Sequence, residues 1–109
     1  MADAYSKRAQ CILMLDHQSE QDLRMALEDS TKAFQLAPGN EEHLLVIATC
    51  NMRLERLAEA ATALNSAIAL NPENERALFH QAFCHRLDGK YREAIDNLTK
   101  VLYSVSIFI

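Results

Sequence analysis

The sequence repeats itself at a fixed interval, and this period constrains the fold more than any other feature. The sequence positions of Pro38 and Pro72 differ by 34. The same interval relates several sets of apolar residues: Ala26, Ala60 and Ala94; Ala33, Ala67 and Val101; Leu36 and Leu70; Leu44 and Leu78; Ala48 and Ala82. A fixed period of this length is typical of repeat arrays, in which each unit buries its apolar face against its neighbours. The chain is therefore expected to be a stack of similar units.

The composition favours helices in each unit. Half of the 109 residues are apolar and 24% are charged, so the chain can bury the core of one domain. Gly and Pro number only two each, and Trp is absent. Sandwiches, barrels and Rossmann-type folds need more turn residues at short intervals. The fold class is expected to be all-α.

Each unit is predicted to consist of two helices joined by a short turn. Apolar residues recur with helical spacing over residues 2–15, 21–36, 41–55, from the turn near Arg56 to Leu70, over 75–87 and over 91–103. Asn71 ends one helix, because the residue before a proline is pushed out of the α region. Gly89 ends another helix, because glycine accepts the backbone of a helix stop.

Small and large residues at repeated positions indicate how the helices pack. Ala60 and Ala94 are predicted to lie where the two helices of a pair cross closely, since a larger side chain there would force the axes apart. Leu64, Tyr91 and Leu98 are predicted to fill the space between neighbouring hairpins.

This pattern resembles the tetratricopeptide repeat family, whose 34-residue unit follows W-x2-L-G-x2-Y…A-x3-F…P. The second unit reads Leu44-x2-Ile47-Ala48-x2-Asn51…Ala60-x3-Leu64…Pro72, the third reads Leu78-x2-Gln81-Ala82-x2-His85…Ala94-x3-Leu98, and the first reads Tyr5-x2-Arg8-Ala9-x2-Ile12…Ala26-x3-Ser30…Pro38. The resemblance implies one array over residues 1–109, a right-handed α-solenoid of three antiparallel hairpins. The repeats are placed at 2–40, 41–74 and 75–103, with an apolar tail at 104–109.

Two features depart from the family pattern. The interval from Ala9 to Ala48 is longer than the repeat period by five positions, so repeat one carries a five-residue insertion around 16–20. Either the first turn is an enlarged loop or one helix is a turn longer than usual. The third repeat also lacks a closing Asn-Pro and a polar capping helix.

The resemblance implies a non-catalytic protein–protein interaction module, a scaffold or adaptor that holds a protein or peptide partner on its concave face. By analogy the first helix of each pair lines that face, which adds further residues to the main candidates: Asp3, Ser6, Lys7, Gln10, Leu13, Met14, Glu42, Val46 and Leu87. The main partner-binding candidates are Leu45, Thr49, Met52, Arg53, Arg76, Phe79, His80, Phe83 and Arg86. Aromatic, Met and Arg side chains are common on adaptable binding surfaces. The alternative is that Leu45, Phe79 and Phe83 pack between hairpins.

One subclass of the family binds an acidic C-terminal carboxylate with a clamp of Lys and Asn residues. The corresponding positions here are Ser6, Gln10, Val46, Arg76 and His80, and only Arg76 keeps the charge of the clamp. Without the other groups a carboxylate would lose its charge-assisted hydrogen bonds. A heat-shock chaperone co-factor role is therefore not expected.

Other function classes find little support. The net charge is −4 and the basic residues are scattered, so no nucleic-acid partner is expected. No apolar run approaches a membrane span, and the polar start MADAYSKR does not resemble a signal peptide. His80 and Cys84 with His85 lack the further ligands of a zinc site and the third group of a catalytic triad. No enzyme activity, cofactor or metal is expected. Cys11, Cys50 and Cys84 are interpreted as buried reduced thiols of a cytoplasmic protein.

The C-terminal end suggests an alternative function. Apolar residues continue along the last helix into the tail, and self-association is predicted at Leu102, Val105, Ile107 and Phe108. A two-fold homodimer would close this patch on itself. In this alternative the chain is a structural fragment of a longer solenoid that mainly associates with itself.

Overall fold

The computed structural model describes residues 1–107, with side chains described for residues 1–103, and within this range it contains six α-helices and no strand. The helices are α1 (Ala2–Leu13), α2 (Glu20–Leu36), α3 (Glu41–Arg53), α4 (Leu57–Leu70), α5 (Glu75–Leu87) and α6 (Tyr91–Ile107). The six predicted helices are confirmed. α1 ends before its predicted end at position 15, and the backbone of α6 continues into the segment that was predicted to be a tail.

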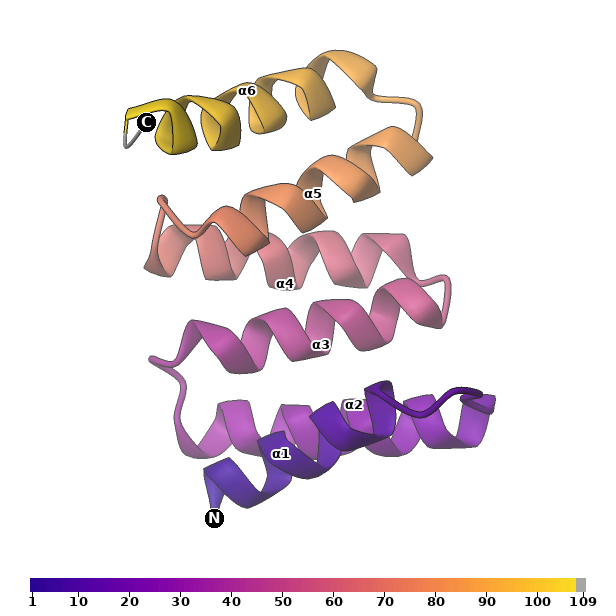
Figure 1. Ribbon diagram of the computed structural model, residues 1–109. Helices are drawn as coiled ribbons and strands as arrows, with labels where there is room; N and C mark the ends of the chain where they lie inside the picture. Colours follow the sequence, from indigo (N-terminus) through magenta and orange to yellow (C-terminus); the bar gives the residue numbers. More distant parts are fainter. Residues whose placement is uncertain (108–109) are drawn as a thin grey trace.

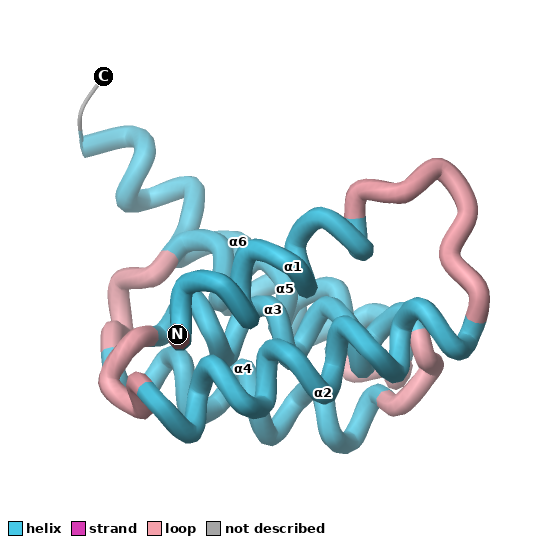
Figure 2. Tube along the Cα trace, turned by 90° about the horizontal axis from the view of Figure 1, so that it is seen from below, coloured by secondary structure: helices cyan, strands magenta, loops and turns pink. Residues whose placement is uncertain are grey.

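The helices form three hairpins stacked in one direction (Figure 1). The partners α1–α2, α3–α4 and α5–α6 contact each other within a hairpin, and α3 and α5 each contact both helices of the hairpin before them. Seen along the stack, α1, α3 and α5 lie in one layer, while α2 and α4 lie in the other (Figure 2). The architecture is an all-α solenoid of helical hairpins.

Two turns share a left-handed backbone at equivalent positions. Gly89 has a φ of 76°, as its predicted role as a helix stop requires, and Glu55, one repeat earlier, has a φ of 63°. Glycine adopts this conformation readily, whereas a glutamate adopts it only uncommonly. The turn geometry of the repeat is thus kept at Glu55 without the residue that favours it.

The five-residue insertion is divided between the first turn and α2. The connection 14–19 is longer than the equivalent connections 54–56 and 88–90. Relative to the equivalent alanines, Ala26 and Ala60, α2 also begins earlier than α4, while α1 is slightly shorter than α3, with 12 residues against 13. Both alternatives therefore hold in part. Ser19 starts α2 with a capping box, in which its hydroxyl accepts from the backbone N–H of Asp22 at 3.0 Å.

The core follows the repeated alanines. Ala60 is 0% exposed and Ala94 is 6% exposed, as predicted for close helix crossings, and Leu64 is fully buried between the second and third hairpins. The same prediction is wrong for Tyr91 and Leu98, which are 64% and 37% exposed. Both residues lie at repeat positions whose side chains were predicted to fill the space between hairpins, but no described helix packs over them.

Two of the buried polar side chains in the first two hairpins, Asp29 and His43, differ in their hydrogen bonding. The carboxylate of Asp29 accepts two hydrogen bonds from Arg8, from Nε at 2.6 Å and from Nη2 at 2.7 Å, and these bonds tie α1 to α2. His43 is 2% exposed, and neither of its ring nitrogens has a hydrogen-bond partner among the described residues. A buried polar group without a hydrogen-bond partner lowers the free energy of unfolding. His43 therefore contributes to the core through the volume of its ring and not through hydrogen bonds.

The cysteines differ from their predicted burial at one position. Cys50 and Cys84 are buried, whereas Cys11 is exposed, so the expectation of three buried thiols is wrong for Cys11. Burial raises the pKa of the Cys50 thiol to about 11 and also raises the pKa of Cys84. A raised thiol pKa disfavours the reactive thiolate, which suits a small residue of the core.

We expect the burial of Cys50 to make the fold less stable in alkali. Below pH 9, the ordinary pKa of this thiol, both the folded and the unfolded states keep it protonated. As the pH rises towards 11 the unfolded state loses this proton first, so the free energy of unfolding should fall by about 1–2 kcal/mol. Urea titrations at neutral pH and near pH 10.5 measure the loss, and Cys50→Ala should reduce it by this amount. An equal loss in both proteins would contradict the expectation.

Candidate functional site

A groove across α3 and α5 brings together six of the nine predicted partner-binding residues. They surround a cavity of about 410 Å³, lined by Thr49, Met52, Arg53, Phe79, His80 and Phe83. α3 contributes the first three residues and α5 contributes the other three, as the spacing of a helix face requires. Phe79 is 57% exposed and Phe83 is 37% exposed, so their side chains are available to a partner. The alternative that these aromatics are packed away between hairpins does not hold.

A second cavity extends the groove to α1. Its volume is about 230 Å³, and it shares Thr49 and Arg53 with the first cavity. The remaining lining residues are Gln10, Leu13, Met14, Glu42, Leu45, Val46 and Arg76. The two cavities therefore form one groove along α1, α3 and α5, which we call the concave groove.

Two of the nine predicted residues lie differently from the other seven. Leu45 is only 2% exposed and belongs to the core between the second and third hairpins, so it offers a partner little surface. Arg86 lines neither of the two groove cavities. Its guanidinium lies 5.0 Å from the ring centre of Phe83, on the side facing α6.

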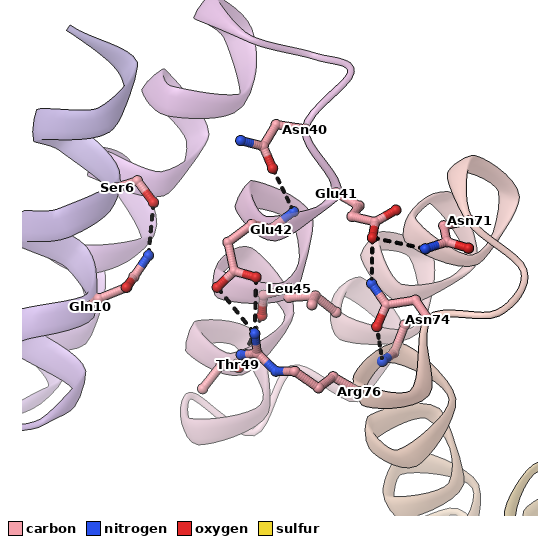
Figure 3. A network of polar contacts seen from close by, with 11 residues as sticks. Ser6, Gln10, Asn40, Glu41, Glu42, Leu45, Thr49, Asn71, Asn74 and Arg76 are labelled. Atoms are coloured by element: carbon pink, nitrogen blue, oxygen red, sulfur yellow. Dashed lines mark hydrogen bonds and ion pairs between the residues drawn. The ribbon is translucent and has the colours of Figure 1, made fainter. Parts of the chain in front are cut away.

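The charges of the concave groove are unequal along its length. At the start of α5, Arg76 pairs with Glu42 at 2.9 Å, which neutralises both groups (Figure 3). At the other end, Arg53 donates to the backbone carbonyl of Leu13 at 2.6 Å and faces no carboxylate in the lining of the larger cavity. Burial, with a contribution from the charge of Arg76, lowers the pKa of His80. His80 is therefore neutral at pH 7, and Arg53 is the charged group of the larger cavity.

A polar network fixes the two walls of the groove relative to each other. One carboxylate oxygen of Glu41 accepts hydrogen bonds from the side-chain amides of Asn71 at 3.1 Å and Asn74 at 2.9 Å (Figure 3). Asn74 also caps α5 by accepting from the backbone N–H of Ala77. These bonds link the start of α3 to the start of α5, so the groove is preformed.

Residues at the positions of the carboxylate clamp are engaged in other contacts within the protein. Ser6 is 3% exposed and accepts a hydrogen bond from Gln10 at 3.0 Å (Figure 3). Val46 is 5% exposed and packs in the core with Cys50. Arg76 is paired with Glu42. The residues present do not form the cluster of free polar groups that a terminal carboxylate would need.

A third cavity was not predicted from the sequence. It measures about 120 Å³, lies between α5 and α6, and is lined by Phe79, Ala82, Phe83, Arg86, Ala94 and Leu98. Phe79 and Phe83 thus line the concave groove on one side and this end cavity on the other. The repeat could have predicted this cavity. Leu98 is equivalent to Leu64, which is buried beneath the following hairpin, and no described hairpin follows Leu98.

The predicted self-association residues are only partly described. The side chain of Leu102 is 66% exposed on α6. Val105 and Ile107 lie on the described backbone of α6, but their side chains are not described, and Phe108 lies outside the described residues. Among the described residues, no helix has the length and apolar character of a membrane span, and no group of three or more His, Cys, Asp or Glu residues is placed to hold a metal ion.

Comparison with known proteins agrees with the geometry of the fold. Residues 76–105 match the family model described as Tetratricopeptide repeat. Two curated relatives are each called Protein SGT1 homolog. The protein from Bos taurus is 28% identical over 81 residues, and the protein from Homo sapiens is 26% identical over the same length. This stretch is 74% of the present chain but only 24% and 22% of those proteins, so the chain spans about a quarter of their length.

Solved structures share the whole arrangement of helices. The second TPR of Spaghetti (RPAP3), bound to the HSP90 peptide SRMEEVD, superposes with a TM-score of 0.83 at 20% identity, covering 94% of this chain and 90% of that one. The Sgt2 TPR domain from Aspergillus fumigatus gives 0.84 at 16% identity, with 96% and 66% covered. The TPR2B domain of yeast Sti1, in a complex with pHsp70, gives 0.82 at 20% identity, with 92% and 76% covered. The chain has the fold of a tetratricopeptide repeat domain, and residues 76–105 match the repeat itself.

Proposed function

We propose that the chain is a non-catalytic module that binds a segment of a partner protein in the concave groove. The observation that carries this proposal is the exposure of Phe79 and Phe83 beside Arg53 in a preformed cavity of about 410 Å³. Exposed aromatic and arginine side chains in a concave site are the usual anchors of protein recognition. The similar domains of Spaghetti (RPAP3) and Sti1, which hold HSP90 and Hsp70 peptides, support a peptide ligand.

The groove favours a partner held by an apolar side chain. Met52, Phe79 and Phe83 offer flexible and aromatic surface for such a side chain, and Arg53 offers a cation to a neighbouring carboxylate or carbonyl group. Because the groove is preformed, the scaffold loses little conformational freedom on binding. The clamp positions lack the free Lys and Asn groups, so recognition of an acidic terminal carboxylate is not part of this proposal.

We expect Phe79→Ala and Phe83→Ala each to weaken partner binding by about 2 kcal/mol, roughly 30-fold in Kd, as for other interface anchors. The probe is a peptide selected from a random peptide library on the unaltered protein and then titrated by calorimetry. Tyr103→Ala is the matched control, because Tyr103 is 69% exposed and lines neither groove cavity. The peptide SRMEEVD, present in the Spaghetti complex, should bind much more weakly than the selected peptide.

A different pattern would refute the groove. If Phe79→Ala lowers the melting temperature sharply but leaves the affinity for the peptide unchanged, the aromatic is a packing residue. Thr49→Lys provides an independent check, because Thr49 lines both groove cavities and not the end cavity. Undiminished binding by Thr49→Lys would place the peptide elsewhere on the molecule.

Self-association through the α6 end is the second candidate function. It is favoured by the exposure of Tyr91, Ile95 and Leu98, which are 64%, 51% and 37% exposed along one face of α6. Neighbouring exposed apolar side chains of this kind often mark an interface.

A further inference from the structure

Neighbouring hairpins pack through the same kind of contact at two places in the molecule. The surfaces at the two ends of the solenoid are equivalent, in the repeat, to the two surfaces that meet in this contact. In this contact, which we call the seam, the first helix of a hairpin packs against the preceding hairpin. α3 packs in this way on α1 and α2, and α5 packs in this way on α3 and α4. The pair α5–α6 has the position of a receiving hairpin, and α1 has the position of a docking helix. In the described chain neither is covered.

The receiving side of the seam is built from repeated positions. On the second hairpin these positions are Leu45 and Leu64, which are 2% and 0% exposed beneath α5. The equivalent residues on the third hairpin, one repeat later, are Phe79 and Leu98, which are 57% and 37% exposed and line the end cavity. Ile95 likewise occupies the position of Ala61, which lines the boundary between α4 and α5.

The docking side is also repeated. α5 inserts Ala77 and Cys84 into the core of the second seam, and both are buried there. The equivalent residues on α1 are Ala4 and Cys11, and both are exposed. A hollow of about 350 Å³, lined by Met1, Ala4, Tyr5 and Arg8, lies on the same outer face of α1. The same alanine and cysteine, at the same spacing, are therefore buried on α5 and open on α1.

The side-chain volumes at equivalent positions differ between the two seams. In the first seam the receiving residues are the small Ser6 and Ser30, and the docking helix supplies the large His43 and the small Cys50. In the second seam the receiving residues are the larger Leu45 and Leu64, and the docking helix supplies the small Ala77 and Cys84. The third receiving surface has Phe79 and Leu98, so it requires a helix with small residues. α1 provides Ala4 and Cys11 at those positions.

The charges agree with the volumes. In the second seam Glu42 on the receiving helix pairs with Arg76 on the docking helix at 2.9 Å. At the open end the receiving residue is Arg76 and the equivalent residue on α1 is Asp3, again an acid opposite a base. Arg76 already pairs with Glu42, so a docked α1 would bring Asp3 as a second carboxylate to this arginine.

We propose that copies of this chain associate head to tail, with α1 of one copy occupying the α5–α6 face of the next and continuing the seam. Such an interface joins two different surfaces and leaves one of each free at the ends, so it builds open series instead of closed dimers. The two proposals share Phe79, which lines both the end cavity and the concave groove, so a docked α1 would compete with a bound peptide for this side chain. Cys11 and Ile95 line neither groove cavity, so variants at these two positions test the assembly without altering the groove.

The test uses one variant for each side of the seam. Cys11→Glu blocks the docking face and Ile95→Glu blocks the receiving face, and both replace exposed helix residues, so circular dichroism should show intact folds. Masses are measured by light scattering in a reducing buffer from about 10 µM to about 1 mM. The unaltered chain should grow beyond a dimer as its concentration rises. Each variant alone should remain a monomer of 12.3 kDa, and an equimolar mixture should form a 1:1 dimer and nothing larger.

Three outcomes would overturn the proposal. A two-fold contact between α6 ends would leave Cys11→Glu dimeric by itself, and mixing the two variants would then give no dimer that contains one copy of each. A dimer that never grows would equally exclude head-to-tail assembly. A monomer of the unaltered chain at every concentration would exclude association between copies altogether. Cys11→Ser is the matched control for a disulfide artefact, because it keeps a small side chain and should assemble like the unaltered protein.

Discussion

Shortening Leu64 to alanine is expected to cost about 3 kcal/mol of the free energy of unfolding, whereas Leu98→Ala is expected to cost about 1 kcal/mol or less. The two leucines occupy the same position in successive repeats. Leu64 is 0% exposed beneath α5, while Leu98 is 37% exposed at the open end. Removal of a buried leucine leaves a cavity that the close-packed surroundings only partly fill. The partly exposed Leu98 loses fewer contacts, and its site remains open to water.

Urea titrations at a few micromolar, where assembly through the ends is minimal, measure both changes. A domain of this size has about 5–15 kcal/mol of total stability, so the difference is well within reach of the method. Similar losses for Leu64→Ala and Leu98→Ala would mean that Leu98 is as well covered as Leu64. That result would contradict the open third seam.

Enlarging Ala60 is expected to be nearly as costly. Ala60→Leu adds volume at a helix crossing where the alanine is 0% exposed, and forcing the helices apart should cost about 3 kcal/mol. Ala69 lies on the exposed side of the same helix, so Ala69→Leu should change stability by less than about 0.5 kcal/mol.

The same pair tests the repeat register. Because both substitutions convert alanine to leucine within α4, helix propensity changes equally and cancels in the comparison. Melting temperatures and denaturant midpoints should agree in their ranking. Equal tolerance of the two leucines would show that the alanines of the repeat do not mark close crossings.

The sequence predicts most of the fold because a fixed repeat period sets equivalent positions in every hairpin. Once Ala60 and Ala94 are recognised as equivalent, the crossing points and turns follow. The division of the insertion between the first turn and α2 did not follow. Helix extension and loop enlargement can absorb the same number of residues, and the capping box at Ser19 decides the boundary. The repeat period does not specify such a local set of hydrogen bonds, so the period alone could not predict where α2 begins.

The candidate site was predicted less completely than the fold. The helical spacing places Phe79, His80 and Phe83 on one face of α5, and these residues do line the groove. Spacing alone could not separate Leu45 from Phe79, which are equivalent in the repeat but differ in exposure, with 2% against 57%. The difference arises from what stacks on each hairpin. The third hairpin covers Leu45, whereas no described hairpin covers Phe79. The position of a residue within its repeat does not say whether another hairpin follows.

The three cysteines occupy one repeated position and lie in three different settings. Cys50 is buried in the first seam, Cys84 is buried in the second, and Cys11 is exposed on the outermost helix. In a stack held together by neighbour contacts, one seam can open while the other stays closed, with separate free energies for each event. Each thiol becomes accessible to a reagent only when its own seam opens. The rates at which Cys50 and Cys84 react therefore measure the opening of individual joints between hairpins, with Cys11 as the internal standard for an unprotected thiol.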